Sequence, residues 1–408
     1  MISTQLEGRQ FRRTVLSRWS IFAVCSFQFW VSFQTACLAT FLVPRQSVLS
    51  VGLTHKSEVL ALYYLFAMVA YLIADHIWPV LSNRGVLVPA RWGRRRPYLL
   101  LGVLLSSVAM LAMAITSGVL PATMPATWYA VLLAVQAVGV SCATSAWKAL
   151  IVESVRRDQL PAFHSWRAIL SSLGVLLGSG VTACLGELIR IPTVYSLMIF
   201  CALICSIASM RLSEATHRQS SPPFRIKEIW ATTMEPFAQR DFGFLYASRF
   251  LSDLACTSLW YFFPFFLADA VTDFSLMGGK LTISDSALVA NGFAMCFAGA
   301  CSLIGLAVSR VAHSHLSIKI PLYVSGPIAA AGVCVLLFAS SSYIAAIITM
   351  AVSGFALSIW FDSHLFLSQE IIVTAANDER SLGALLLAPQ VSAILGLLPI
   401  GAIIDWLF

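Results

Sequence analysis

The feature that most constrains the fold of this chain is a series of long apolar runs separated by short polar segments. The eleven runs cover residues 19–43, 57–81, 98–119, 126–152, 165–187, 193–211, 242–271, 285–309, 320–339, 343–366 and 381–405. Each run is long enough to cross about 30 Å of hydrocarbon as a helix. Backbone groups inside hydrocarbon must bond to one another, which a helix achieves within one segment. The sequence therefore predicts an all-α polytopic membrane protein.

Composition agrees with this prediction and limits the function. Of the 408 residues, 59% are hydrophobic and 11% are charged, whereas a soluble domain carries about 25% charge. The formal charge of +7 does not indicate nucleic-acid binding, because the basic residues lie in loops between spans. All ten cysteines lie in apolar runs, where they are expected to be buried hydrophobic residues.

Motifs of the common enzyme and ATPase classes are missing from the sequence. There is no HExxH, GxSxG or CxxC, and Gly279-Lys280 is followed by Leu281 in place of the P-loop hydroxyl residue. We therefore expect neither an enzyme nor an ATP-driven pump, and we expect no cofactor or metal.

The distribution of lysine and arginine predicts the orientation. With the N-terminus inside the cell, the inner segments hold nineteen basic residues, whereas the outer segments hold only Arg45, Lys56, Arg190 and Lys280. Basic short loops stay on the cytoplasmic side. The chain is thus expected to be a multi-pass protein of the cell membrane with a cytoplasmic N-terminus.

The longest polar segment divides the chain into two halves. Residues 1–211 hold six spans, residues 212–241 form a linker with Ser220, Ser221, Pro222 and Pro223, and residues 242–408 hold five spans. A twelfth span is not visible. Two sets of spans joined by a cytoplasmic linker are typical of secondary transporters.

The loop after the second span carries the most specific motif. Five arginines (Arg84, Arg91, Arg94, Arg95 and Arg96) and no acid lie between two spans, and the loop ends as Arg-Trp-Gly-Arg-Arg-Arg-Pro-Tyr. This motif resembles the major facilitator superfamily. More narrowly, it is similar to the sugar:cation symporter group, which includes plant sucrose/H⁺ symporters and glycoside–pentoside–hexuronide transporters. Pro79 and Asn83 depart from that group's Gly and Asp.

Two further stretches resemble the same group. Lys148-Ala-Leu-Ile-Val-Glu153 is similar to its R-A-L-x-A-D motif, and the run from Gly354 to Asp362, with the later Leu-Gly and Pro-Gln pairs, is similar to a motif of bacterial members. The resemblance implies a two-half helical bundle that transports a sugar by alternating access. Arg84, Arg91 and the Arg94–Arg96 run would then belong to a gating loop.

Ionisable residues inside spans are costly, and they are therefore the first candidates for function. Arg249 and Asp253 are four residues apart in the seventh span, a spacing that allows an ion pair or a site for sugar hydroxyls and a proton. Asp362 matches an acid of the resembled group and is a candidate for coupling or substrate binding. Asp75 is the third candidate, because an aspartate surrounded by hydrocarbon can hold a proton; it can instead pair with Arg167.

Other polar residues inside spans suggest a gate and a binding site. Lys148, Glu153 and Arg167 are expected to form a charge cluster at the inner ends of the fourth and fifth spans. Aromatic rings and amides suit sugars, although a tryptophan in a span is more often an anchor or a packing residue. The candidate substrate contacts are Gln34, Trp147, Arg249, Trp260 and Trp360.

The sequence therefore predicts a monomeric carrier that moves a sugar or glycoside together with H⁺, or alternatively with Na⁺. Two other functions remain open. One is a proton-coupled exporter of drugs or metabolites, which the apolar and aromatic spans favour. The other is a membrane sensor or paralogue that transports nothing, which Pro79 and Asn83 favour.

Overall fold

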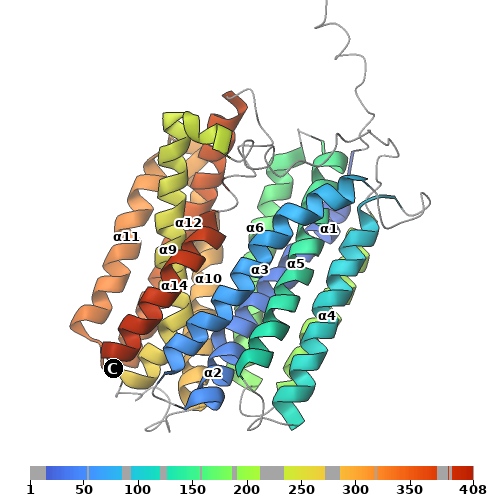
Figure 1. Cartoon of the computed structure of the whole chain (residues 1–408). Helices are drawn as coiled ribbons and strands as arrows, with labels where there is room; N and C mark the ends of the chain where they lie inside the picture. The colour runs from blue at the N-terminus through green and yellow to red at the C-terminus, as the bar shows by residue number, and fades with distance from the viewer. Residues whose placement is uncertain are drawn as a thin grey trace, which may run out of the picture.

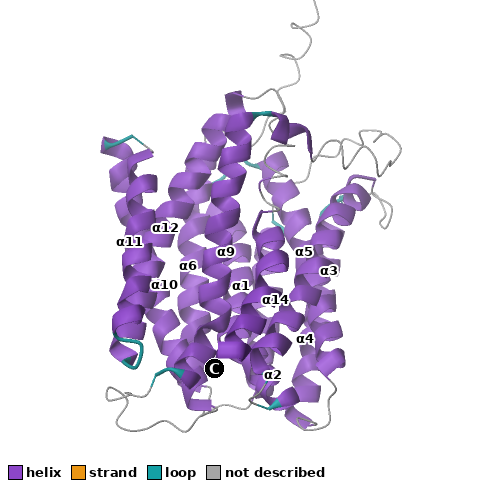
Figure 2. Cartoon of the chain, turned by 60° about the vertical axis from the view of Figure 1, so that its left-hand side comes forward, coloured by secondary structure: helices purple, strands orange, loops and turns teal. Residues whose placement is uncertain are grey.

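The computed structural model describes residues 15–52, 55–84, 93–119, 126–156, 159–185, 191–211, 234–271, 285–317, 319–374, 385 and 388–407. These residues are almost entirely helical (Figure 2). The helices are α1 (Arg18–Cys37), the π-helical turn η2 (Leu38–Leu42), α2 (Val43–Val51), α3 (Lys56–Arg84), α4 (Arg96–Val119), α5 (Ala126–Ser154), α6 (Leu160–Leu185), α7 (Ile191–Ser209), the 3₁₀ turn η5 (Glu235–Ala238), α9 (Arg240–Asp269), α10 (Asp285–His315), α11 (Lys319–Phe338), α12 (Tyr343–Thr374) and α14 (Ala388–Leu407).

The predicted number of spans is confirmed. Eleven helices of the described residues are long and apolar enough to cross a membrane. The first of them is longer than predicted, because α1, η2 and α2 run on as one segment of 34 residues from Arg18 to Val51. Part of the range predicted as a linker is helical as well, since η5 packs Phe237 against Phe242 and Tyr246 of α9; residues 212–233 lie outside the described part.

The helices gather into two bundles that lie side by side (Figure 1). In the first bundle α1 packs on α6 and α7, and α5 packs on α3 and α4. In the second, α12 packs on α10 and α11, and α14 packs on α9. The bundles meet along two helix pairs, α6 with α10 and α3 with α14.

Glycines let these helices approach closely. A Cβ atom added to Gly292 or Gly299 of α10 would lie 2.9 Å from the backbone nitrogen of Ala183 or Leu176 on α6, respectively. Small residues at such contacts are the usual means of close packing between membrane helices. The two bundles therefore touch backbone to backbone along this pair.

The molecule has two ends, which we name by what lies there. The basic end carries the α3–α4 loop and the start of α14, and the C-terminal end carries the start of α3 and the end of α14. At the C-terminal end, Lys56 Nζ of α3 lies 2.5 Å from Asp269 Oδ1 of α9. The Asp405 carboxylate of α14 accepts hydrogen bonds from the backbone N–H groups of Ser57 and Glu58 at 3.1 and 2.8 Å.

A third polar contact joins the bundles near the same end. The buried amide of Asn291 donates from Nδ2 to the carbonyl oxygen of Thr40 in η2 at 2.9 Å. At the basic end the described residues show a single such bond, from Arg310 Nη2 to the carbonyl oxygen of Ser165 at 3.0 Å. The hydrogen bonds between the bundles are thus concentrated at the C-terminal end.

Candidate functional site

The Arg249–Asp253 pair lies inside α9, as the spacing of four residues predicts. Arg249 Nε is 2.6 Å from Asp253 Oδ2, and Asp253 is only 6% exposed. The guanidinium also lies over two aromatic rings of α12, 4.6 Å from the centroid of Phe361 and 5.8 Å from that of Trp360. A cation that is held by a carboxylate and two aromatic faces is stabilised by both.

Two tryptophans extend this site. Trp260 follows Asp253 by seven residues and therefore lies on the same face of α9; its buried indole N–H has no acceptor among the described residues. Trp360 is 7% exposed and stacks on His364 with ring centroids 4.6 Å apart. The site thus offers an unused donor and an aromatic face beside the ion pair.

Asp75, Lys148 and Arg167 form a second group of charges, in the first bundle. Asp75 of α3 accepts a hydrogen bond from Ser145 Oγ of α5 at 2.7 Å. Lys148, one turn further along α5, is close enough to be attracted to Asp75 and repelled by Arg167 of α6. Neither Lys148 nor Arg167 makes a hydrogen bond or ion pair within the described residues. The alternative in which Arg167 pairs with Asp75 is not what the geometry shows, because the bonded partner is Ser145.

The two groups of charges face one another across the junction of the bundles. Arg167 is close enough to Arg249 for the two guanidiniums to repel each other. Lys148 lies six residues from the basic end of its helix, Arg167 seven, and Asp75 and Arg249 nine. At about 1.5 Å per residue these side chains share a depth of roughly 9–14 Å.

Asp362 lies in a different environment, between α12 and α10. Its Oδ2 accepts a hydrogen bond from Ser309 Oγ at 2.7 Å and lies 3.8 Å from His313 Nδ1. His313 Nε2 in turn lies 3.0 Å from Ser363 Oγ. The sequence reasoning missed both α10 residues, although the spacing of four between Ser309 and His313 places them on one helix face.

Gln34 and Trp147, both candidate substrate contacts, are buried in the first bundle. Gln34 is 1% exposed, and its Oε1 accepts from Gln136 Nε2 at 3.4 Å. The indole of Trp147 donates to the carbonyl oxygen of Val24 at 3.0 Å and stacks on Phe27. The hydrogen bond and the stacking make Trp147 a packing residue in this conformation.

The arginine loop is described from Gly93 onward. Gly93 has a φ of +77°, a left-handed conformation that favours glycine, and it begins the turn into α4. Arg95 Nη1 donates to Ser82 Oγ at 3.4 Å, and the Tyr98 hydroxyl donates to the carbonyl oxygen of Leu81 at 2.9 Å. These bonds fasten the start of α4 to the end of α3. Arg91 and the side chains of Arg84 and Glu153 lie outside the described residues.

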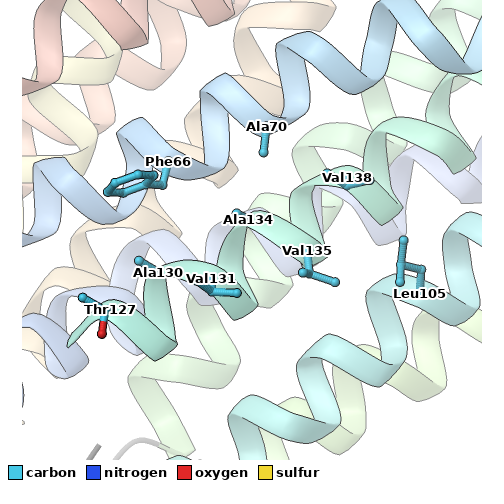
Figure 3. Close-up of a pocket in the computed structure, with 9 residues that line it drawn as sticks. All are labelled: Phe66, Ala70, Leu105, Thr127, Ala130, Val131, Ala134, Val135 and Val138. Atoms are coloured by element: carbon cyan, nitrogen blue, oxygen red, sulfur yellow. The ribbon is translucent and has the colours of Figure 1, made fainter. Parts of the chain in front are cut away.

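A pocket of about 610 Å³ opens between α3, α4 and α5, away from these charges (Figure 3). Its lining residues are Phe66, Ala70, Leu105, Thr127, Ala130, Val131, Ala134, Val135 and Val138. Phe66 and Val131 are more than half exposed, so the pocket belongs to the lateral surface. A sugar would find only the Thr127 hydroxyl there, and this pocket is therefore not the candidate site.

One group of potential metal ligands exists among the described residues, at the C-terminal end. The ligand atoms of His55, Glu58 and Asp405 lie within 4.8 Å of one another. Both oxygens of Asp405 already accept backbone hydrogen bonds, so its observed role is to cap α3.

Comparison with known proteins gives a family and a fold. The family model of the Major Facilitator Superfamily matches residues 28–397. None of the curated proteins compared with the chain matches it in sequence.

Several solved transporter structures are similar in fold. A point mutant of the nucleoside transporter NupG has a TM-score of 0.66 and 14% identity, over 96% of this chain and 92% of that one. A D-xylose-proton symporter has a TM-score of 0.64 and 16% identity, over 93% and 89%. The xylose transporter XylE from E. coli, in a partially occluded inward open conformation, has a TM-score of 0.65 and 14% identity, over 96% of both chains.

Proposed function

The chain belongs to the Major Facilitator Superfamily of membrane transporters, and we propose that it is a proton-coupled symporter of a sugar or glycoside. In this proposal residues 1–211 and 242–408 are the two moving halves, and the basic end faces the cytoplasm. The C-terminal end, where the hydrogen bonds between the bundles gather, is then the closed outer side. Alternating access would open that end and close the basic one.

The observation that carries the proposal is the ion pair between Arg249 and Asp253. A carboxylate that is 6% exposed inside a membrane helix exchanges a proton at a cost that its partner sets. While Asp253 is ionised, it holds the Arg249 side chain at 2.6 Å. When Asp253 takes up a proton it loses the charge that holds Arg249. The guanidinium is then free to donate to the hydroxyl groups of a solute.

The neighbouring aromatic residues suit a sugar. The indole N–H of Trp260 is a buried donor without an acceptor among the described residues, and the ring of Trp360 lies beside the Arg249 guanidinium. Sugars present hydroxyl groups at their edges and C–H groups on their faces, so a donor and an aromatic face can bind both. Proton and solute would therefore meet at one place on α9.

The similar structures support this reading at the level of fold. Two of the three described above are of xylose transporters, one of them a proton symporter. The others include a nucleoside transporter and a bacterial homologue of drug peptide transporters, at 14% and 12% identity. Nucleosides and dipeptides therefore belong in any test panel beside sugars.

Proteoliposomes that contain a pH-sensitive dye test the proposal. If the protein is a symporter, addition of its sugar outside will acidify the interior. Asp253→Asn removes the proton-accepting group, so it is expected to abolish acidification while the sugar still binds. Asp241→Asn is the matched control, because Asp241 lies on the same helix but is exposed, and it should transport normally.

Two outcomes would contradict the proposal. Acidification that persists in Asp253→Asn but disappears in Asp362→Asn would move the coupling site to the Ser309–His313–Asp362 group. A trace that stays flat with every sugar would refute sugar symport, and a response to a nucleoside or dipeptide would then identify the other solute class.

A further inference from the structure

The charges at the junction of the bundles do not balance. Lys148, Arg167 and Arg249 bring three positive charges, whereas the described carboxylates of this group bring only two. Asp253 is bonded to Arg249, and Asp75 is bonded to Ser145 and attracts Lys148. One positive charge is therefore in excess among the described side chains of the group.

The excess charge is centred on Arg167. It is partly buried and makes no hydrogen bond or ion pair within the described residues. The two cations near it, Lys148 and Arg249, both repel it. A guanidinium carries five donors that suit carboxylate and phosphate oxygens. Leaving such a group without an acceptor inside a membrane protein costs several kcal/mol, so the arrangement is not explained by stability.

We propose that Arg167 and Lys148 bind an oxyanion carried by the transported solute, a carboxylate or a phosphate monoanion. This inference rests on the proposed function, which it narrows from neutral sugars to solutes with one acidic group. One negative charge would neutralise the excess on Arg167. The two cations come from adjacent helices of the first bundle, α5 and α6. The rest of the solute would then extend toward Arg249, Trp260 and Trp360 of the second bundle.

This arrangement also gives the acidic group a part in transport. Arg167 and Arg249 lie on opposite bundles and repel one another, so the empty site opposes closure of the basic end. A bound anion between them converts that repulsion into attraction to a shared partner. Solute binding would thus favour the bundles drawing together at the basic end, which is the movement that alternating access requires.

Thermal unfolding of the purified full chain, with matched pairs of solutes, tests the inference. The panel would contain glucose with gluconate and with glucose 6-phosphate, and xylose with xylonate. We expect an acidic member to raise the melting temperature more than its neutral partner. Arg167→Gln and Lys148→Gln should each weaken binding of the acidic member about tenfold or more, and Arg167→Lys should keep the preference. The carboxylate and phosphate members of the panel distinguish the two oxyanions.

The stability of the empty protein gives a readout that a structural role would not produce. Because Arg167 is uncompensated, Arg167→Gln should raise the melting temperature without solute. The loss of a structural ion-pair partner would lower it. Arg211→Gln is the control, since Arg211 is exposed and its removal should change neither the stability nor the preference.

The outcomes also separate this inference from the proposed function. The inference is overturned if no acidic solute stabilises the protein more than its neutral partner, or if Arg167→Gln lowers the stability of the empty protein. Acidification driven by a neutral sugar in the same preparation would then leave proton symport standing. Binding of an acidic solute without any proton movement would uphold the inference and refute the coupling.

Discussion

Two ion pairs lie on the same helix and differ in where their partners come from. Asp253 and Asp269 are sixteen residues apart on α9, or roughly 24 Å. Asp253 pairs with Arg249 of its own helix, whereas Asp269 pairs with Lys56 of α3 in the other bundle. Lys56 is also 6% exposed and lies 5.4 Å from the centroid of the Phe265 ring.

The difference teaches which pair can respond to which event. A pair within one helix keeps its geometry when the bundles move, so only a proton or a solute can break it. A pair between bundles must separate when its end of the molecule opens. The Arg249–Asp253 pair is thus suited to binding, and the Lys56–Asp269 pair to holding one conformation.

The largest effect is expected from breaking the pair within α9. Arg249→Met leaves the Asp253 carboxylate buried without a partner, which costs about 3–5 kcal/mol when one member of a buried pair is removed. We expect a lower melting temperature in detergent and no transport. The double variant Arg249→Met with Asp253→Leu should recover most of the stability, because no charge is then left alone, but none of the transport. A single variant as stable as the wild type would mean that the pair is well hydrated.

A smaller effect, and at the other end, is expected from breaking the pair between bundles. Lys56→Met removes the charge but keeps an apolar side chain against Phe265. Since Asp269 is hydrated once the end opens, we expect the open population to rise about tenfold, or about 1.4 kcal/mol. Amide hydrogen exchange of residues 56–64 and 261–269 should quicken. Lys319→Met is the control, because Lys319 is exposed at the basic end, and unchanged exchange in Lys56→Met would refute the holding role.

The smallest effect concerns the packing that accompanies the second pair. A Cβ atom on Gly401 of α14 would lie 2.8 Å from the carbonyl oxygen of Ser57, beside Lys56. Gly401→Ala should therefore push α14 away from α3 at a cost of about 1 kcal/mol. It should speed exchange at the C-terminal end alone. In Gly326→Ala the added atom meets nothing within 4 Å, so that variant should behave like the wild type; equal effects would show that the α3–α14 contact is loose.

Much of the fold follows from the sequence, because hydrocarbon leaves a spanning backbone few choices. The lengths of the apolar runs predict the spans, and the glycines of α6 predict close packing: a Cβ on Gly174 would lie 2.5 Å from the Phe29 carbonyl oxygen of α1. The π-helical turn η2 is not predicted, because nothing in its sequence, Leu-Ala-Thr-Phe-Leu, differs from an ordinary apolar helix.

The candidate site is predictable where its contacts are local. The Arg249–Asp253 pair follows from a spacing of four residues. Contacts between distant segments do not follow in this way: Ser145 with Asp75, and Ser309 and His313 with Asp362, depend on which helices become neighbours. Lys56 shows the same limit, since the sequence marks it only as a basic residue of an outer loop, and its partner is 213 residues away.

The bond between Asn291 and Thr40 has a consequence for biogenesis. Chains are made from the N-terminus, so the first bundle enters the bilayer before α10 does. The Asn291 amide is fully buried, and a polar group that reaches hydrocarbon without a partner is costly. The Thr40 carbonyl oxygen in η2 is already in place when α10 arrives and can accept the Nδ2 donor. A newly inserted α10 thus has an enthalpic reason to leave the lipid and dock in one register, so the order of synthesis itself helps the two bundles find each other.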